Sequence, residues 1–85
     1  MELTNVEIDL INRIKDKENE ILRLVAEVRA LLAAQSELAD QDQKFSQRFH
    51  QAEPGRWAAL AKTSFQVGFM YLVRAVSQPH NSGII

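Results

Sequence analysis

The C-terminal part of the chain gathers cations without acids. Residues 54–85 contain Arg56, Lys62 and Arg74 but neither Asp nor Glu. Guanidinium and ammonium groups bind phosphate through charge-assisted hydrogen bonds. The same stretch holds polar side chains of the kinds that meet base edges or sugar hydroxyls: Thr63, Gln66 and Ser77. This combination favours a small phosphorylated ligand.

The alternative is a solvated helix face whose cations pair with acids elsewhere in the chain. Residues 1–53 carry 11 Asp and Glu against 7 Lys and Arg, a net charge of −4, so partners exist. Residues 54–85 carry a net charge of +3. An asymmetry of this kind between halves indicates an anionic partner, but composition alone does not separate the two interpretations.

A second candidate pair lies near the start of the chain. Asn12 and Lys15 are three residues apart, so they share one face of a helix. Asn can pair with a base edge and Lys can meet a phosphate, although both are also common on exposed helices. Trp57 and Tyr71 are of the type that stacks on nucleobases, and a helical wheel places them mainly on the apolar side.

The sequence offers no catalytic constellation, and we expect no enzyme. His50 and His80 lie in polar segments without an acid cluster at metal-ligand spacing, whereas a zinc site needs three or four convergent ligands. There is no Cys, and we find no nucleophile–base pair or P-loop. We therefore expect neither metal nor cofactor, and we interpret both histidines as solvated.

Two helices must position these residues. Thr4 and Glu7 fit a capping box, and apolar residues then recur at three-to-four spacing as far as Leu32, interrupted at Lys17 and Glu18, where we expect a wet layer or a bend. We predict a single all-α helical-hairpin domain over residues 1–85. Its parts are a helix over about 4–38, a polar hinge over about 39–53, a helix over about 54–78 and a tail over 79–85. For residues 41–52 the sequence does not decide between loop and helix, because the segment is polar but Phe45 and Phe49 have the four-residue spacing of a helix.

The second predicted helix is apolar over more than one face. Pro54 suits its first turn, and Pro79 ends it. At about 100° per residue, its polar residues gather within roughly 120°, and the rest of the circumference is apolar. One partner helix cannot cover so wide an arc. The small residues near Gly68 permit close helix approach, so we predict a subunit interface in a compact homo-oligomer.

Length and composition set the outer limits. With 85 residues, the chain is long enough for one domain, whose hydrophobic core would be only marginally stable by itself. With its net charge of −1, the chain lacks the positive potential typical of a protein that binds long nucleic acid. No apolar run reaches membrane-spanning length and no signal peptide is visible. We expect a soluble intracellular protein.

Two blocks resemble a known family. "LTNVEIDLINRIK" (residues 3–15) and "RWAALAKTSFQVGFMYLVRAVSQP" (residues 56–79) are similar to the phage anti-CBASS cyclic-nucleotide sponges, which share a helical-hairpin domain with the anti-Thoeris sponges. The resemblance implies a non-enzymatic protein in the cytoplasm of the infected bacterial host. Such a protein sequesters the cyclic di- and trinucleotides of CBASS-type defence. It also implies a homohexamer, with dinucleotide pockets between subunits and trinucleotide pockets near the symmetry axis.

The resemblance also implies roles for single residues. Lys15 matches a phosphate contact of the dinucleotide pocket, with Asn12 beside it, and Arg56, before Trp57, matches a trinucleotide-pocket residue. Four more residues match motif positions without an individual role: Lys62, Thr63, Gln66 and Arg74. The family's dinucleotide pocket usually includes an aromatic residue upstream of the Leu-Ser/Thr motif, which is not in this sequence. We expect trinucleotide binding to be less affected by that difference.

Three rival functions stay open. A coiled-coil adaptor or structural protein–protein interaction module would bind a second polypeptide and no small molecule. A small regulator of nucleic acid is disfavoured by the acidic first half. Hydrolysis of a cyclic nucleotide is disfavoured by the lack of a metal or nucleophile constellation.

Overall fold

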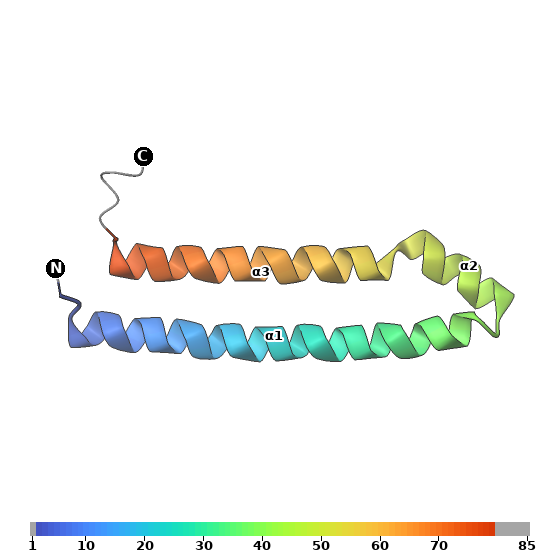
Figure 1. The fold of residues 1–85 in the computed structure, drawn as a ribbon, viewed down its shortest axis with the longest axis horizontal. Coiled ribbons are helices and arrows are strands. Elements are labelled where there is room, and N and C mark those ends of the chain that lie inside the picture. The colour runs from blue at the N-terminus through green and yellow to red at the C-terminus, as the bar shows by residue number, and fades with distance from the viewer. Residues whose placement is uncertain (1, 80–85) are drawn as a thin grey trace.

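The chain forms a long helical hairpin. A computed structural model describes residues 2–79, which form helices α1 (Asn5–Ala39), α2 (Gln43–Ala52) and α3 (Pro54–Ser77). Helices α1 and α3 run antiparallel side by side, and α2 closes one end (Figure 1). Residues 2–79 contain no strand, and their extents of 60 × 28 × 12 Å describe a flat rod. The predicted all-α hairpin is confirmed.

Helix α1 begins at the predicted capping box. The Thr4 backbone N–H donates to Glu7 Oε1 at 2.8 Å, and the Glu7 N–H donates to Thr4 Oγ1 at 3.1 Å. These two bonds satisfy donors that the first helical turn leaves free. The hydrogen bond from the Thr4 backbone, and then that from its side chain, lower the pKa of the Glu7 carboxyl below its ordinary value.

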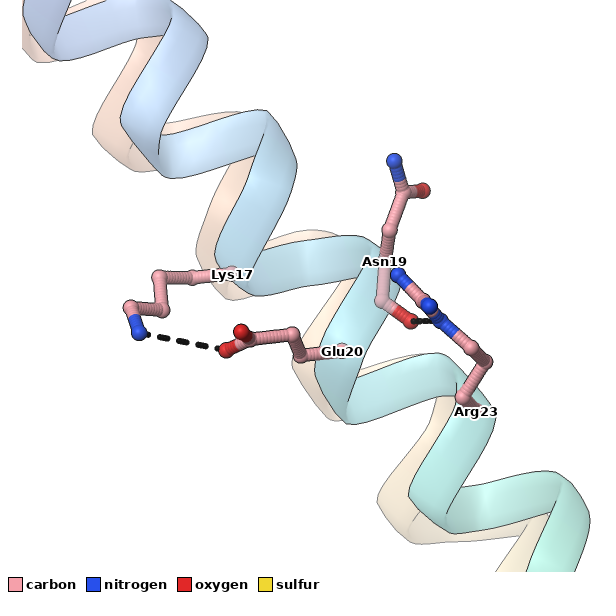
Figure 2. Close-up of polar contacts among 4 residues, drawn as sticks. All are labelled: Lys17, Asn19, Glu20 and Arg23. Atoms are coloured by element: carbon pink, nitrogen blue, oxygen red, sulfur yellow. Dashed lines mark hydrogen bonds and ion pairs between the residues drawn. The ribbon is translucent and has the colours of Figure 1, made fainter.

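Polar residues interrupt the apolar pattern of α1 without ending the helix. Lys17 Nζ contacts Glu20 Oε2 at 3.1 Å, and the Arg23 Nε–H donates to the backbone oxygen of Asn19 at 3.3 Å (Figure 2). Glu18 is half-buried. The bonds within the helix hold these side chains along its surface, and α1 stays continuous from Asn5 to Ala39.

The segment between the two long helices contains a helix of its own. The Asp42 side chain caps α2 by accepting from the N–H groups of Lys44 and Phe45, at 3.1 and 3.3 Å. Phe45 and Phe49 lie 5.9 Å apart between ring centroids and are half-buried, and α2 packs against α1. The question left open for residues 41–52 is thus resolved, since most of them are helical.

A single residue separates α2 from α3. Glu53 has φ 50° and ψ 50°, the left-handed conformation, and its N–H donates to the backbone oxygen of His50. Pro54 then occupies the first turn of α3, as the sequence predicted. At the other end of α3, Gln78 is also left-handed, and its N–H donates to the Arg74 oxygen at 2.8 Å. His80 and most of the predicted tail lie outside the described residues.

The hairpin has almost no core of its own. Within residues 2–79 only Val25 and Ala39 are buried, with 8% and 4% of their surfaces exposed. Trp57 and Tyr71 on α3 each keep 60% of their surface exposed. Large apolar side chains of α3 are therefore left uncovered by their own chain.

Among the described helices, none combines the length and the apolar character needed to span a bilayer.

Candidate ligand-binding site

Six of the eight candidate residues lie on one side of the hairpin, the exceptions being Trp57 and Lys62. Apolar grooves between α1 and α3 open on the other side, where Leu10 and Leu24 of α1 meet Leu72 and Ala61 of α3. At about 100° per residue, Lys15 points to the side of α1 opposite these leucines. The same rotation places four candidate residues of α3 on that side too: Arg56, Thr63, Gln66 and Arg74. We call Asn12, Lys15 and these four residues the cation face.

The cation face has two ends that one chain does not join. The grooves pair residues 10–17 of α1 with Phe69 and Leu72, and residues 21–28 with Ala58 and Ala61. Arg56 is thus level with residue 28 of α1 or beyond, about 20 Å along the hairpin from Lys15 at 1.5 Å per residue. Arg74, two residues beyond Leu72, lies at the same end as Asn12 and Lys15. One protomer places Asn12, Lys15 and Arg74 at the same end of the hairpin and Arg56 toward the other end.

Most cations of this face are not neutralised by the chain itself. Lys15 and Arg74 are exposed. Within residues 2–79 the ion pairs are Arg13–Asp9, Lys17–Glu20 and Arg56–Glu53. None joins a cation of α3 to an acid of α1 across the hairpin. That finding is unfavourable to the interpretation of α3 as a face that pairs with acids of the first helix.

Arg56 is held at the corner between α2 and α3. Its Nη1 contacts Glu53 Oε2 at 3.3 Å, and its guanidinium carbon lies 5.4 Å from the Trp57 ring centroid. Both side chains of the ion pair are more than half exposed, 63% for Arg56 and 56% for Glu53. An exposed pair contributes little to stability, and a guanidinium has five donors. Arg56 therefore keeps most of its capacity for another anion.

Trp57 makes two interactions at the corner between α2 and α3, one with Ala52 and one with Arg56. Its indole Nε1–H donates to the backbone oxygen of Ala52 at 3.1 Å, which satisfies a carbonyl of the last turn of α2. This bond fixes the ring beside Arg56, and most of the ring remains open to solvent. An exposed, fixed indole next to a guanidinium is suited to stacking on a base.

Lys62 differs from the other candidates. The helical wheel groups it with Thr63 and Gln66, but the structure leaves it half-buried, at the edge of the stripe that faces α1. Thr63 and Gln66 are exposed. The aliphatic stem of a lysine can pack along apolar surface while the ammonium group stays in water. Lys62 thus contributes to packing within the chain as well as to the charge of this side.

Sequence reasoning missed Glu53. It is the last acid in the sequence and stands three residues before Arg56, which is ion-pair spacing on a helix. That signal was present but weak, because Glu53 precedes the predicted helix. Its left-handed backbone, invisible in the sequence, places its carboxylate on Arg56.

The hollows of a single protomer do not resemble a nucleotide pocket. Three shallow grooves hold about 230, 220 and 130 Å³, the first lined by α3 alone and the other two by both α1 and α3. These volumes are below the usual 300–1,000 Å³ of ligand sites. The grooves are mainly apolar and lie on the side opposite the cation face. Within residues 2–79 there is also no cluster of three or more His, Asp or Glu suited to a metal ion.

The chain matches a known protein family. The family model described as "Acb2/Tad1, hairpin domain" matches residues 2–77. This chain belongs to that family. A similar protein is "Anti-CBASS protein 2" of Pseudomonas phage JBD67, which is 43% identical over 93 residues. That match covers 92% of this chain and 86% of the relative.

The family match spans every candidate residue. Residues 2–77 include the first sequence block that carried the resemblance, all but the last two residues of the second block, the hinge between them and both ends of the cation face. The resemblance to the anti-CBASS sponge family is therefore confirmed at the level of the family.

Proposed function

We propose that the protein is a phage-encoded immune-evasion protein that sequesters the cyclic di- and trinucleotides of bacterial CBASS-type defence. It acts in the cytoplasm of the infected host and binds the signal without cleaving it. One observation carries the proposal. The family's hairpin presents exposed cations on one face, and Lys15 and Arg74 have no carboxylate partner within residues 2–79. The ligand's phosphates supply the missing negative charge.

The resemblance implies two kinds of pocket, and the separation along the hairpin supports this division. Asn12 and Lys15 serve a dinucleotide at the open end, and Arg56 with Trp57 serves a trinucleotide at the closed end. Lys62, Thr63, Gln66 and Arg74 contribute polar contacts along α3. Phosphate binds to the cations, while amide and hydroxyl groups meet bases or sugars.

Copies of the chain complete each pocket. A single protomer offers only shallow apolar grooves, whereas a ligand site buries most of its ligand. The hairpin also leaves large apolar side chains exposed on α1 and α3. We therefore propose a homo-oligomer, a hexamer, in which the cation faces of neighbouring copies enclose the ligand.

The deciding test is calorimetric titration with 3′,3′-cyclic GMP–AMP, cyclic di-GMP, cyclic triadenylate and a linear control. Submicromolar binding to at least one cyclic compound supports the proposal. The ligand is then recovered after heat denaturation, and intact ligand separates binding from hydrolysis. Absence of binding to every cyclic compound, together with a co-purifying polypeptide, would favour the adaptor function.

A further inference from the structure

The acid that pairs with Arg56 belongs to a residue whose backbone is fixed on both sides. The Glu53 N–H donates to the backbone oxygen of His50 at 3.3 Å. The Glu53 oxygen accepts from the N–H groups of Arg56 and Trp57, at 3.1 and 3.3 Å. These bonds hold Glu53 in the left-handed conformation, which is uncommon for a residue with a side chain. The corner between α2 and α3 therefore determines where the Glu53 carboxylate lies.

The carboxylate occupies only part of the Arg56 guanidinium. Glu53 Oε2 contacts Arg56 Nη1 at 3.3 Å, and both side chains are more than half exposed. A guanidinium has five N–H donors, so donors remain for a second anion. An anion bound to them would lie roughly 6 Å from the Glu53 carboxylate, because the guanidinium and its hydrogen bonds separate the two groups.

A phosphate that binds Arg56 meets a cation that already has one carboxylate. A phosphodiester adds one negative charge, whereas a phosphomonoester adds about 1.5–2 at pH 7. The additional charge of the monoester is repelled by Glu53. At roughly 6 Å in water, one further negative charge weakens binding about three-fold. The arrangement therefore penalises phosphates according to their charge.

We propose that Glu53 is a specificity-determining residue, which makes the closed end of the hairpin select phosphodiesters over phosphomonoesters. The inference rests on the proposed binding of phosphate by Arg56. The phosphates of a cyclic oligonucleotide are all diesters, whereas mononucleotides and 5′-phosphorylated linear oligonucleotides end in a monoester or a polyphosphate. A group that repels the wrong ligand is a common source of specificity. Glu53 has this role against terminal phosphates.

Association of copies preserves the selection. Glu53 and Arg56 are three residues apart in the same chain, so each copy that brings Arg56 to a shared pocket also brings Glu53. The pair adds no net charge to the pocket, however many copies meet there. The surplus charge of a phosphomonoester is therefore not compensated by further copies of this pair.

Two linear trinucleotides that differ by one phosphomonoester test the selection. The probes are triadenylate with a 5′-hydroxyl, triadenylate with a 5′-phosphate, and cyclic triadenylate. Trp57 is the one tryptophan of the chain, so its indole N–H resonance in ¹⁵N-labelled protein reports binding beside Arg56, weak binding included. Titrations at about 10 mM salt, where the Debye length is about 30 Å, leave the charge effect largely unscreened.

In Glu53→Gln, the ratio of the two linear affinities should shift toward the 5′-phosphate at least three-fold relative to the parent. Glu53→Gly should give the same shift, because glycine suits φ 50° and also removes the carboxylate. Glu20→Gln is the matched control. It removes an equal charge from the Lys17 pair of Figure 2 and should leave the ratio unchanged.

The outcomes separate this inference from the proposed function. If cyclic triadenylate binds but the ratio is unchanged in both Glu53 variants, Glu53 does not select and the proposed function stands. A shift of equal size in Glu20→Gln would also overturn the inference, since net charge alone would explain it. Rejection of the 5′-phosphorylated probe by Glu53→Gln as strongly as by the parent would show that another feature excludes it. If no probe binds the parent or the variants, the proposed function fails and the inference fails with it.

Discussion

Arg56 is the residue whose removal should affect ligand binding most. A charged hydrogen bond contributes about 1.5–3 kcal/mol, so Arg56→Ala should weaken binding of cyclic triadenylate by roughly 10- to 150-fold while the assembly keeps its mass. Arg48 is a matched control, since its guanidinium lies 5.2 Å from the Phe45 ring as that of Arg56 lies 5.4 Å from Trp57. Parent-like affinity in Arg56→Ala, measured by calorimetry, removes Arg56 from the site.

Glu53 should oppose the same ligand. Glu53 Oε2 forms an ion pair with Arg56 Nη1 at 3.3 Å, and its negative charge repels an approaching phosphate. Because an exposed pair is worth about 0–1 kcal/mol, Glu53→Gln should strengthen binding by up to about five-fold. Glu20→Gln, which removes the same charge from the Lys17 pair, is the control for a general effect of net charge.

The Glu53 effect must act through Arg56. In an Arg56→Ala background, Glu53→Gln should change the affinity by much less, which a double-mutant cycle measures. An equal gain in both backgrounds would mean that Glu53 acts on the ligand directly and would contradict the competition.

At the level of the helices, the capping box makes the stability of the fold depend on pH. The folded-state pKa of Glu7 is lowered because its carboxylate accepts the Thr4 N–H. Its contribution is present above its ordinary pKa of 4.5 and is lost as the pH falls through the lower, folded-state pKa. Glu7→Gln keeps an acceptor in the box without a charge. The loss of melting temperature between pH 7 and pH 3 should therefore be smaller in Glu7→Gln than in the parent, and an equal loss would exclude this role.

The C-terminus of α3 offers a stabilising change. Gln78 adopts φ 49°, where glycine has no steric penalty and is the usual helix-ending residue. Gln78→Gly should raise the free energy of unfolding by about 0.5–1 kcal/mol, measured by urea unfolding at fixed protein concentration. Asn19→Gly, inside α1, should instead lower it. A destabilised Gln78→Gly would show that its side chain stabilises the helix end.

The sequence predicted the long helices well because their signals are local. Thr4 with Glu7 marks a start, and Pro54 marks another. Helix α2 was ambiguous because its apolar signal consists of Phe45 and Phe49, and their value depends on packing against α1. The register between α1 and α3 and the half-burial of Lys62 arise from contacts between segments, which periodicity within one helix does not encode. The Arg56–Glu53 pair is local, but it depends on the left-handed backbone of Glu53, which the sequence does not show.

At the scale of the whole molecule, the shortage of buried residues predicts concentration-dependent stability. With only Val25 and Ala39 buried among residues 2–79, much of the stabilising apolar burial must come from other copies. The melting temperature should rise by several degrees when the protein concentration increases about 100-fold, as expected when association is linked to folding. Scanning calorimetry at two concentrations measures this. A constant melting temperature would indicate a monomer that is stable by itself.

The absence of acids from α3 has a consequence for speed. Under the proposed function the ligand is contested by the host's own receptor, so its capture would depend on the rate of encounter as well as on affinity. An exposed cation without a carboxylate partner, as Arg74 is within residues 2–79, attracts anions over roughly one Debye length, about 8 Å at physiological salt. Charges of this kind act mainly on the association rate. For the proposed ligand we therefore expect added salt to slow association far more than it changes release.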